Sequence, residues 1–228
     1  MHIIKCGDAK KLLSEIKDSS IDLICTDPPY KDYQSSRTKE KAKKISSKNF
    51  HWESLIKEIE RILKPGRHFY IWCDSLTYSD LYITIKNSKI LKFKNMIIWI
   101  KSNHGSGDLK SGYAPQHEIC VYGHHGKGRA FESNKKRISD VLFKKEDNGR
   151  IKFYKKVSPR EGHPTIKPHE ILKSLIERSS KKNEIVLDPY AGSFSTMKAS
   201  RELNRRSLSF ELDKQYYKKG REFLKKNT

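Results

Sequence analysis

The stretch Ile21-Asp-Leu-Ile-Cys-Thr-Asp-Pro-Pro-Tyr30 decides the fold, because an apolar run ends there in an acid, two prolines and an aromatic ring. The apolar run predicts a buried strand, and ligands of open α/β sheets bind at the carboxyl ends of such strands. Asp27 supplies an acceptor for an N–H group, and Pro28 adds a carbonyl without an N–H of its own. Tyr30 offers a flat face to a planar ring. These groups suit an exocyclic amine on a stacked heterocycle, although an ordinary Asp-Pro-Pro turn is the simpler alternative.

A second strand and turn lie near the other end of the chain. The sequence Glu184-Ile-Val-Leu-Asp188 predicts a buried strand, and it runs through Pro189-Tyr-Ala-Gly-Ser193 into a helix-like stretch. A strand, a glycine turn and a helix N-terminus form a usual nucleoside cradle. Glu211 follows Gly192 by 19 positions, close to the spacing of ~20 at which an acid meets ribose hydroxyls. The sequence lacks the phosphate-binding glycine patterns, so we expect a nucleoside with little phosphate to hold; a plain tight turn is the alternative.

Several segments, in the same order, resemble the amino-methyltransferases of DNA that use S-adenosylmethionine. The order with the catalytic motif first resembles their β class, and the similarity covers nearly the whole chain. The matching segments are Cys6-Gly-Asp8, Asp27-Pro-Pro-Tyr30, Leu63-Lys-Pro-Gly66, Phe69-Tyr-Ile-Trp72, Ile97-Ile-Trp-Ile-Lys101, His117-Glu118, His163-Pro-Thr-Ile-Lys-Pro168 and Asp188-Pro-Tyr-Ala-Gly-Ser193. One departure is Phe194, which stands where the family often has the second glycine of Gly-Ser-Gly. Its ring would either crowd the methionine part of the cofactor or point into the core.

The resemblance implies a role for each matching residue. Asp27, Pro28, Pro29 and Tyr30 would form the catalytic motif, with no metal. Within the cofactor site, Asp8 would hold the adenine amine and Glu211 the ribose hydroxyls. The cofactor-binding residues would be Asp8, Thr165, Lys167, Asp188, Pro189, Gly192, Ser193 and Glu211.

The expected reaction is methyl transfer from S-adenosylmethionine to the exocyclic amine of adenine in double-stranded DNA. A duplex hides that amine, so the base must be flipped out, with Tyr30 as its stacking partner. The family's cytosine members more often begin the motif with Ser, so Asp27 favours adenine over the amine of cytosine or a base in RNA. None of the four cysteines follows a proline, so attack on ring carbon 5 by a thiolate is not expected. A different class of protein, a nucleic-acid-binding subunit that no longer uses the cofactor, is the alternative that Phe194 leaves open.

The charge predicts a polyanionic partner. Forty-eight Lys and Arg stand against 27 Asp and Glu, which gives a formal net charge of +21. Double-stranded DNA fits this excess, although part of it is explained equally well by a Lys-rich surface from an A·T-biased genome. The resemblance also makes restriction–modification an expected role, with two further expected partners, a second copy of the chain and a cognate restriction endonuclease. No stretch approaches the ~18 apolar residues of a membrane helix and no apolar signal core begins the chain, so a cytoplasmic protein with four reduced, isolated cysteines is expected.

The apolar pattern predicts alternating strands and helices. Strands are expected near residues 3–6, 21–26, 69–73, 96–100, 118–122, 185–188 and 207–210. Helices are expected near residues 10–16, 52–63, 76–87, 168–179, 196–203 and 215–224. This alternation indicates an α/β fold with a doubly wound, mainly parallel sheet, and the resemblance makes it a Rossmann-like methyltransferase fold with permuted motif order in one domain, residues 1–228.

Two segments interrupt the alternation. Residues 124–162 are basic with interleaved aromatic rings and are expected to form the target-recognition insertion, since such residues suit phosphate contacts and base stacking. Residues 31–48 carry seven Lys and Arg and are expected to order against the substrate. A surface loop or an interface is the alternative for each segment.

Overall fold

A central eight-stranded sheet organises the protein. The computed structural model describes residues 1–29, 50–104, 111–132, 138–145, 151–154 and 166–226. The sheet has the strand order β1-β10-β9-β2-β3-β5-β4-β6, and β7 pairs with β8 apart from it. The strands are β1 (His2–Cys6), β2 (Ile21–Thr26), β3 (Leu63–Cys73), β4 (Leu91–Ile100), β5 (His117–His125), β6 (Val141–Leu142), β7 (Lys144–Lys145), β8 (Ile151–Lys152), β9 (Ile185–Asp188) and β10 (Arg206–Glu211). The helices are α1 (Ala9–Ser14), α2 (Trp52–Ile62), α3 (Tyr78–Asn87), α4 (His169–Ser179), α5 (Ser195–Glu202) and α6 (Lys214–Lys226).

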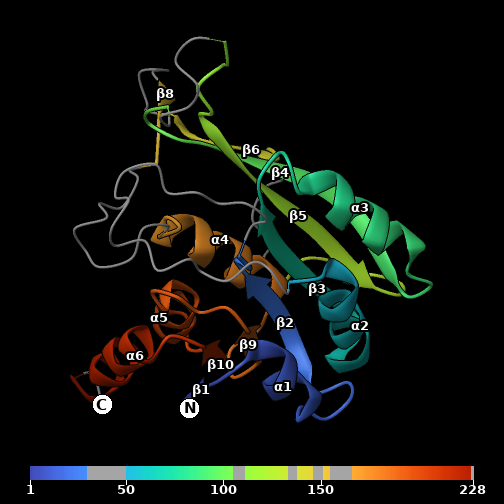
Figure 1. Ribbon diagram of the computed structural model, residues 1–228, viewed down its shortest axis with the longest axis vertical. Coiled ribbons are helices and arrows are strands. Elements are labelled where there is room, and N and C mark those ends of the chain that lie inside the picture. The colour runs from blue at the N-terminus through green and yellow to red at the C-terminus, as the bar shows by residue number, and fades with distance from the viewer. Residues whose placement is uncertain (30–49, 105–110, 133–137, 146–150, 155–165, 227–228) are drawn as a thin grey trace.

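Helices cover both faces of this sheet. Figure 1 shows α1, α2 and α3 on one side and α4, α5 and α6 on the other. Ile24 and Phe69 belong to the core under α1–α3, whereas their neighbours Leu23 and Tyr70 belong to the core under α4 and α5. Side chains of a strand alternate between its faces, so burial on both faces explains the unbroken apolar runs. The predicted doubly wound α/β fold is confirmed.

The strand order reverses in the middle of the sheet. β1, β10, β9, β2 and β3 run parallel, and β5 runs antiparallel to both β3 and β4. From the central pair β2 and β9, the chain proceeds to β3 on one side and to β10 on the other. Ligands of such sheets bind in the crevice outside the carboxyl ends at this switch point. Asp27 and Asp188 therefore lie where a ligand is expected.

The elements differ from the sequence-based expectations mainly at their ends. β3 begins at Leu63, directly after α2, and not near residue 69. Leu63 pairs with Ile21, and the register then shifts before His68 pairs with Leu23. Pro65 and Gly66 lie within this bulge. In the sequence, the same pair predicted the end of the preceding helix and a gap before the next strand. The two-residue strands β6, β7 and β8 were not expected, because they are too short to show a period of two.

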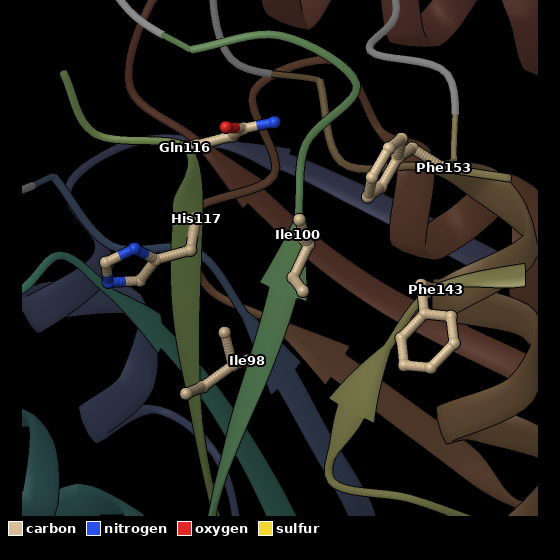
Figure 2. Close-up of a pocket in the computed structure, with 6 residues that line it drawn as sticks. All are labelled: Ile98, Ile100, Gln116, His117, Phe143 and Phe153. Carbon is tan, nitrogen blue, oxygen red and sulfur yellow. The ribbon is translucent and has the colours of Figure 1, made fainter. Parts of the chain in front are cut away.

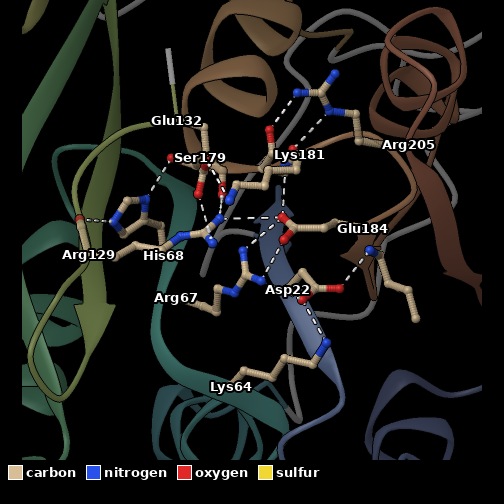
Figure 3. A network of polar contacts seen from close by, with 12 residues as sticks. Asp22, Lys64, Arg67, His68, Arg129, Glu132, Ser179, Lys181, Glu184 and Arg205 are labelled. Atoms are coloured by element: carbon tan, nitrogen blue, oxygen red, sulfur yellow. Dashed lines mark hydrogen bonds and ion pairs between the residues drawn. The ribbon is translucent and has the colours of Figure 1, made fainter. Parts of the chain in front are cut away.

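A polar network ties the amino-terminal edge of the sheet together (Figure 3). Asp22 on β2 is buried and accepts a hydrogen bond from the Ile185 N–H at 2.9 Å. It also pairs with Lys64 at 2.7 Å and with Arg67 at 3.1 Å. Arg67 in turn holds Glu184 through two hydrogen bonds, of 2.8 and 2.5 Å. Such bidentate contacts fix geometry, so this edge cross-links β2, β3 and β9 opposite the carboxyl ends.

The first part of the predicted recognition insertion belongs to this same edge. His124 lies in β5 and pairs with His68 on β3. Arg129 pairs with Glu184 at 3.3 Å, and Phe131 stacks on Tyr122 with ring centroids 5.5 Å apart. Residues 124–132 therefore pack on the body of the domain, at the edge opposite Asp27.

Two findings bear on the expected location and redox state. Across the described ranges, no helix is long and apolar enough to cross a membrane. Cys25, Cys73 and Cys120 are buried free thiols, whereas Cys6 is exposed at the end of β1.

Candidate active site

Acidic side chains gather at the carboxyl-terminal edge of the sheet, and five of them belong to the candidate site. Asp8 follows β1, Glu211 ends β10, Asp188 ends β9 and Asp27 follows β2. Glu118 reaches the same edge from the start of β5, because that strand is reversed. The first four were predicted as site residues. Glu118 was noted only within a matching segment and given no role.

Asp27 is held by a buried lysine. The Lys167 Nζ lies 2.5 Å from Asp27 Oδ2 and 3.0 Å from Glu118 Oε2. Only 5% of Lys167 is exposed, and its ammonium also lies 5.4 Å from the centre of the Trp72 ring. Burial alone would lower the pKa of Lys167, but the carboxylates of Asp27 and Glu118 outweigh burial and the pKa is raised. Lys167 is therefore a charged group beside Asp27.

Asp188 lies beneath the same edge and is fully buried. Its Oδ1 accepts the Thr26 hydroxyl at 2.8 Å and the Tyr190 N–H at 3.1 Å. Burial raises its pKa to about 6, despite the hydrogen bonds from Thr26 and Tyr190, which act in the opposite direction. Pro189 follows and is buried as well. Asp188 thus joins β9 to β2 through Thr26, and its pKa lies above that of an ordinary aspartate.

Glu211 is built into the glycine turn. Its Oε2 accepts the Gly192 N–H at 2.7 Å, and its Oε1 accepts the Asp213 N–H at 2.7 Å. Gly192 has a φ of 51°, a left-handed conformation that glycine adopts at little cost. Burial raises the pKa of Glu211, although the two N–H groups favour its charged form. The carboxylate keeps further acceptor sites, since an ionised carboxylate has about four.

The remaining predicted residues lie nearby or outside the described residues. Asp8 is exposed, and its Oδ1 accepts the Lys10 N–H at 2.8 Å as the cap of α1. The Ser193 and Ser195 hydroxyls lie 2.6 Å apart at the start of α5. Tyr30 and Thr165 fall in the ranges outside the described residues, as do residues 31–48.

A family model described as DNA methylase, of the N6/N4 methyltransferase type, matches residues 21–222. The chain belongs to the DNA methylase family. The predicted relationship to the DNA amino-methyltransferases is therefore confirmed.

Individual members of the family match over most of the chain. The type II methyltransferase M.HpaI of Haemophilus parainfluenzae is 29% identical over 235 residues, covering 96% of this chain and 73% of its own. The DNA adenine methyltransferase YhdJ of Escherichia coli K12 is 28% identical, covering 94% of this chain and 79% of its own. The crystal structure of an M1.HpyAVI–SAM complex superposes with a TM-score of 0.69 at 22% identity, over 98% of this chain and 100% of that chain. The structural match supports the fold.

In this DNA methylase, the departure at Phe194 is accommodated within the core. Phe194 is 2% exposed and packs with Ile4, Ala191 and Met197. Its ring lies against Gly220 of α6, where an added Cβ would come within 2.5 Å of the ring. Of the two expected orientations, the ring adopts the one that points into the core. The exposed Asp8 carboxylate and the Glu211 carboxylate beside Gly192 are acceptors of the kind that the amine and hydroxyl groups of a nucleoside require.

Replacing Phe194 with glycine is expected to destabilise this DNA methylase without strengthening cofactor binding. Removing a buried phenyl ring costs ~3–5 kcal/mol. Phe194 has a φ of 60°, so relief of left-handed strain returns about 1 kcal/mol. Denaturant unfolding should show a net loss of ~2–4 kcal/mol, with the dissociation constant for S-adenosylmethionine unchanged. Tighter cofactor binding with no loss of stability would show that the ring does crowd the crevice.

Replacing Asp188 with asparagine is expected to stabilise the ligand-free methylase against unfolding at pH 7.5. The same replacement is expected to weaken the binding of S-adenosylmethionine. A buried acid whose pKa is raised destabilises the fold above that pKa, near pH 6, and has no such cost below the ordinary value of 3.8. The difference corresponds to at most about 3 kcal/mol, since each tenfold change in proton affinity is ~1.4 kcal/mol. Thermal melts of wild type should therefore fall between pH 4 and 6 more steeply than those of Asp188→Asn. Parallel pH curves for the two proteins would count against this assignment.

A pocket of about 500 Å³ lies beside the carboxyl end of β4. In the sheet, β3 and β5 separate β4 from β2. Figure 2 shows Ile98 and Ile100 on β4 with Phe143 and Phe153 across from them. Its described lining is Ile98, Ile100, Gln116, His117, Phe143 and Phe153. Aromatic rings from residues 138–154 thus reach the carboxyl edge, where Tyr154 also bridges to Lys101.

Proposed function

We propose that this DNA methylase transfers a methyl group from S-adenosylmethionine to the exocyclic amine of adenine in double-stranded DNA, at a specific site. The observation that carries the proposal is the position of Asp27 and Pro28. They follow β2 at the switch point of the sheet, beside β9 and its glycine turn. A carboxylate and a carbonyl with no competing N–H match the two hydrogens of a base amine.

Asp27 and Pro28 would act on a poor nucleophile. The lone pair of an adenine amine is conjugated into the ring, and two fixed acceptors favour a tetrahedral nitrogen. S-adenosylmethionine supplies an electrophilic methyl group on a sulfonium. The amine nitrogen would bond to the methyl carbon, the carbon–sulfur bond would break with its electron pair on sulfur, and the nitrogen would release one proton to water. Asp27 stabilises the positive charge that develops on the nitrogen.

The cofactor would be held by the acids around the glycine turn. Glu211 and Asp8 offer carboxylates for ribose hydroxyls and the adenine amine. Asp188, Pro189, Gly192 and Ser193 would face the methionine part, with Thr165 nearby. The turn offers no cluster of lysines for a phosphate, which suits a cofactor without one.

Adenine is favoured over cytosine by two observations. The motif begins with Asp27, whereas cytosine members of the family more often begin it with Ser. YhdJ, whose alignment covers 94% of this chain at 28% identity, is named a DNA adenine methyltransferase. Labelled cofactor with mixed DNA and RNA, followed by nucleoside mass spectrometry, tests the proposal. The expected product is 6-methyladenine in DNA; 4-methylcytosine, or label in RNA alone, would overturn it.

Residues 138–162 are the proposed recognition part of the insertion at 124–162. The support is that residues 124–132 pack at the far edge, whereas Phe143 and Phe153 lie beside the carboxyl edge. Aromatic rings near basic residues suit base stacking and phosphate contacts. Exchanging residues 138–162 for those of a relative should change the methylated sequence and leave cofactor binding intact; an unchanged site after the exchange would refute the assignment.

DNA binding is expected to depend steeply on salt, because 48 Lys and Arg outnumber 27 acids. A protein that neutralises about six phosphates should give a log–log slope of roughly −5. Fluorescence anisotropy between low and physiological salt measures this slope. A flat response would show that the excess charge is solvated surface.

Two partners accompany the proposed function, a second copy of the chain and a cognate restriction endonuclease. M.HpaI, a relative, is named a type II methyltransferase, which supports the second. Light scattering of the purified chain tests for the second copy. Restriction of unmethylated DNA by cells that carry the genes next to the one for this chain tests for the endonuclease.

A further inference from the structure

A chain of four alternating charges runs from the catalytic acid along the carboxyl edge. Lys167 bridges Asp27 and Glu118 at 2.5 and 3.0 Å, and Lys101 lies 3.8 Å from the other oxygen of Glu118. These residues come from four separate parts of the chain. Lys101 and Lys167 are 9% and 5% exposed, so the charges are largely removed from water.

Burial makes this arrangement costly unless every charge is paired. An ion taken from water into a protein interior carries a penalty of several kcal/mol, and only close partners offset it. Among the described residues, this row pairs two cations, Lys101 and Lys167, with two anions, Asp27 and Glu118.

Lys167 fits the needs of Asp27 better than those of a cationic methyl donor. An ammonium 2.5 Å from Asp27 Oδ2 fixes the carboxylate and favours its charged form. A sulfonium carries a positive charge, so a contact with Lys167 would be repulsive. Glu118 offsets part of the lysine's charge, which keeps Lys167 from neutralising the acceptor that the amine needs.

We propose that Lys167 and Glu118 are positioning residues for methyl transfer, which orient the Asp27 carboxylate and keep it ionised while the target amine reacts. This inference rests on the proposed function, but it applies to any base amine. Lys167 is accordingly reassigned from the cofactor site to the catalytic acid.

Single-turnover methylation at saturating cofactor, measured as label in DNA across pH, tests the inference. Lys167→Met should lower the rate about 10²-fold and move the acid limb of the pH–rate profile upward by about one pH unit or more. Lys167→Arg should recover most of the rate and the wild-type limb. Glu118→Gln should move the acid limb downward, because it removes a negative charge near Asp27. Opposite shifts are not expected from lost packing alone.

Other groups near Asp27 also titrate, so the pH–rate profiles of the variants are compared with that of wild type only by their displacement. Asp188 has a pKa of about 6, and burial raises the pKa of the Cys25, Cys73 and Cys120 thiols well above the range of the experiment. The limb therefore belongs to coupled groups, and only its displacement between variants is used. Lys173→Met is the matched control, because Lys173 pairs with Glu202 on the exposed surface of α4. It should match wild type.

Two measurements without turnover complete the test. The dissociation constant for S-adenosylmethionine should change by less than about threefold in Lys167→Met. Without Lys167, Asp27 and Glu118 repel each other at high pH, so the melting temperature of this variant should fall with rising pH more steeply than that of wild type.

A large loss of cofactor affinity with a normal single-turnover rate, or an acid limb that does not move, would overturn the inference. Identification of the methylated base is separate, so finding 4-methylcytosine would defeat the adenine proposal and leave this one standing. If Lys167→Met does not fold, the Lys167→Arg and Glu118→Gln profiles decide alone.

Discussion

Replacing Asp27 with alanine is expected to lower the single-turnover rate of methyl transfer by roughly 10²-fold or more, while cofactor binding stays close to wild type. The size follows from the loss of one preorganised electrostatic group at the reacting nitrogen. The carboxylate pairs with Lys167 and not with the glycine turn, which is why the cofactor should still bind. Rapid-quench measurement of label in DNA, at saturating cofactor, gives the rate.

Asp27→Asn separates the charge of this group from its shape. The amide keeps an acceptor oxygen but carries no charge to oppose the charge on the amine, so its rate should lie near that of Asp27→Ala. Asp18→Asn is the control, because Asp18 is an exposed acid that pairs with Arg61 on the surface. Near-normal single-turnover methylation by either Asp27 variant would defeat the mechanism.

Replacing Glu211 with alanine is expected to weaken S-adenosylmethionine binding by roughly 10²-fold and to leave DNA binding unchanged. Hydrogen bonds to a charged group contribute ~1.5–3 kcal/mol each, and ribose offers two hydroxyls. The variant also removes the acceptor of the Gly192 N–H at 2.7 Å, so the turn proposed to face the cofactor loses this hydrogen bond. Isothermal calorimetry measures the affinity.

Glu211→Gln keeps the size of the side chain but presents an amide N–H₂ to one of two backbone donors, so it should bind the cofactor more weakly than wild type. Glu222→Ala provides the control, because Glu222 is an exposed acid on α6. An unchanged dissociation constant in Glu211→Ala would remove Glu211 from the cofactor site.

The strands of four or more residues and the six described helices could be predicted, because each has an apolar pattern that extends over several residues. β2, for example, is buried at every position, and its run leads directly into Asp27. The parallel order of the strands then placed Asp27, Asp188 and Glu211 at one edge without any side-chain detail. The ends of elements were less predictable, since the start of β3 depends on its pairing with Ile21 across a bulge.

The contacts within the site were not predictable from the sequence. Lys167 and Asp27 are 140 positions apart, and no local pattern shows that they share a hydrogen bond. Glu118 had a signal, its place beside His117 in a matching segment, but its partner became evident only in the folded chain. The orientation of Phe194 likewise depended on which side chain α6 presents to it.

The contact between Phe194 and Gly220 makes the residue allowed at one position depend on the residue at the other. Phe194 fills the space that Gly220 leaves on α6, so a single phenyl ring occupies a volume shared by the glycine turn and the C-terminal helix. A relative with glycine at the position of Phe194 would have room for a larger side chain at the position of Gly220, whereas two large residues would collide. We therefore expect the residues at these two positions to covary among members of the family.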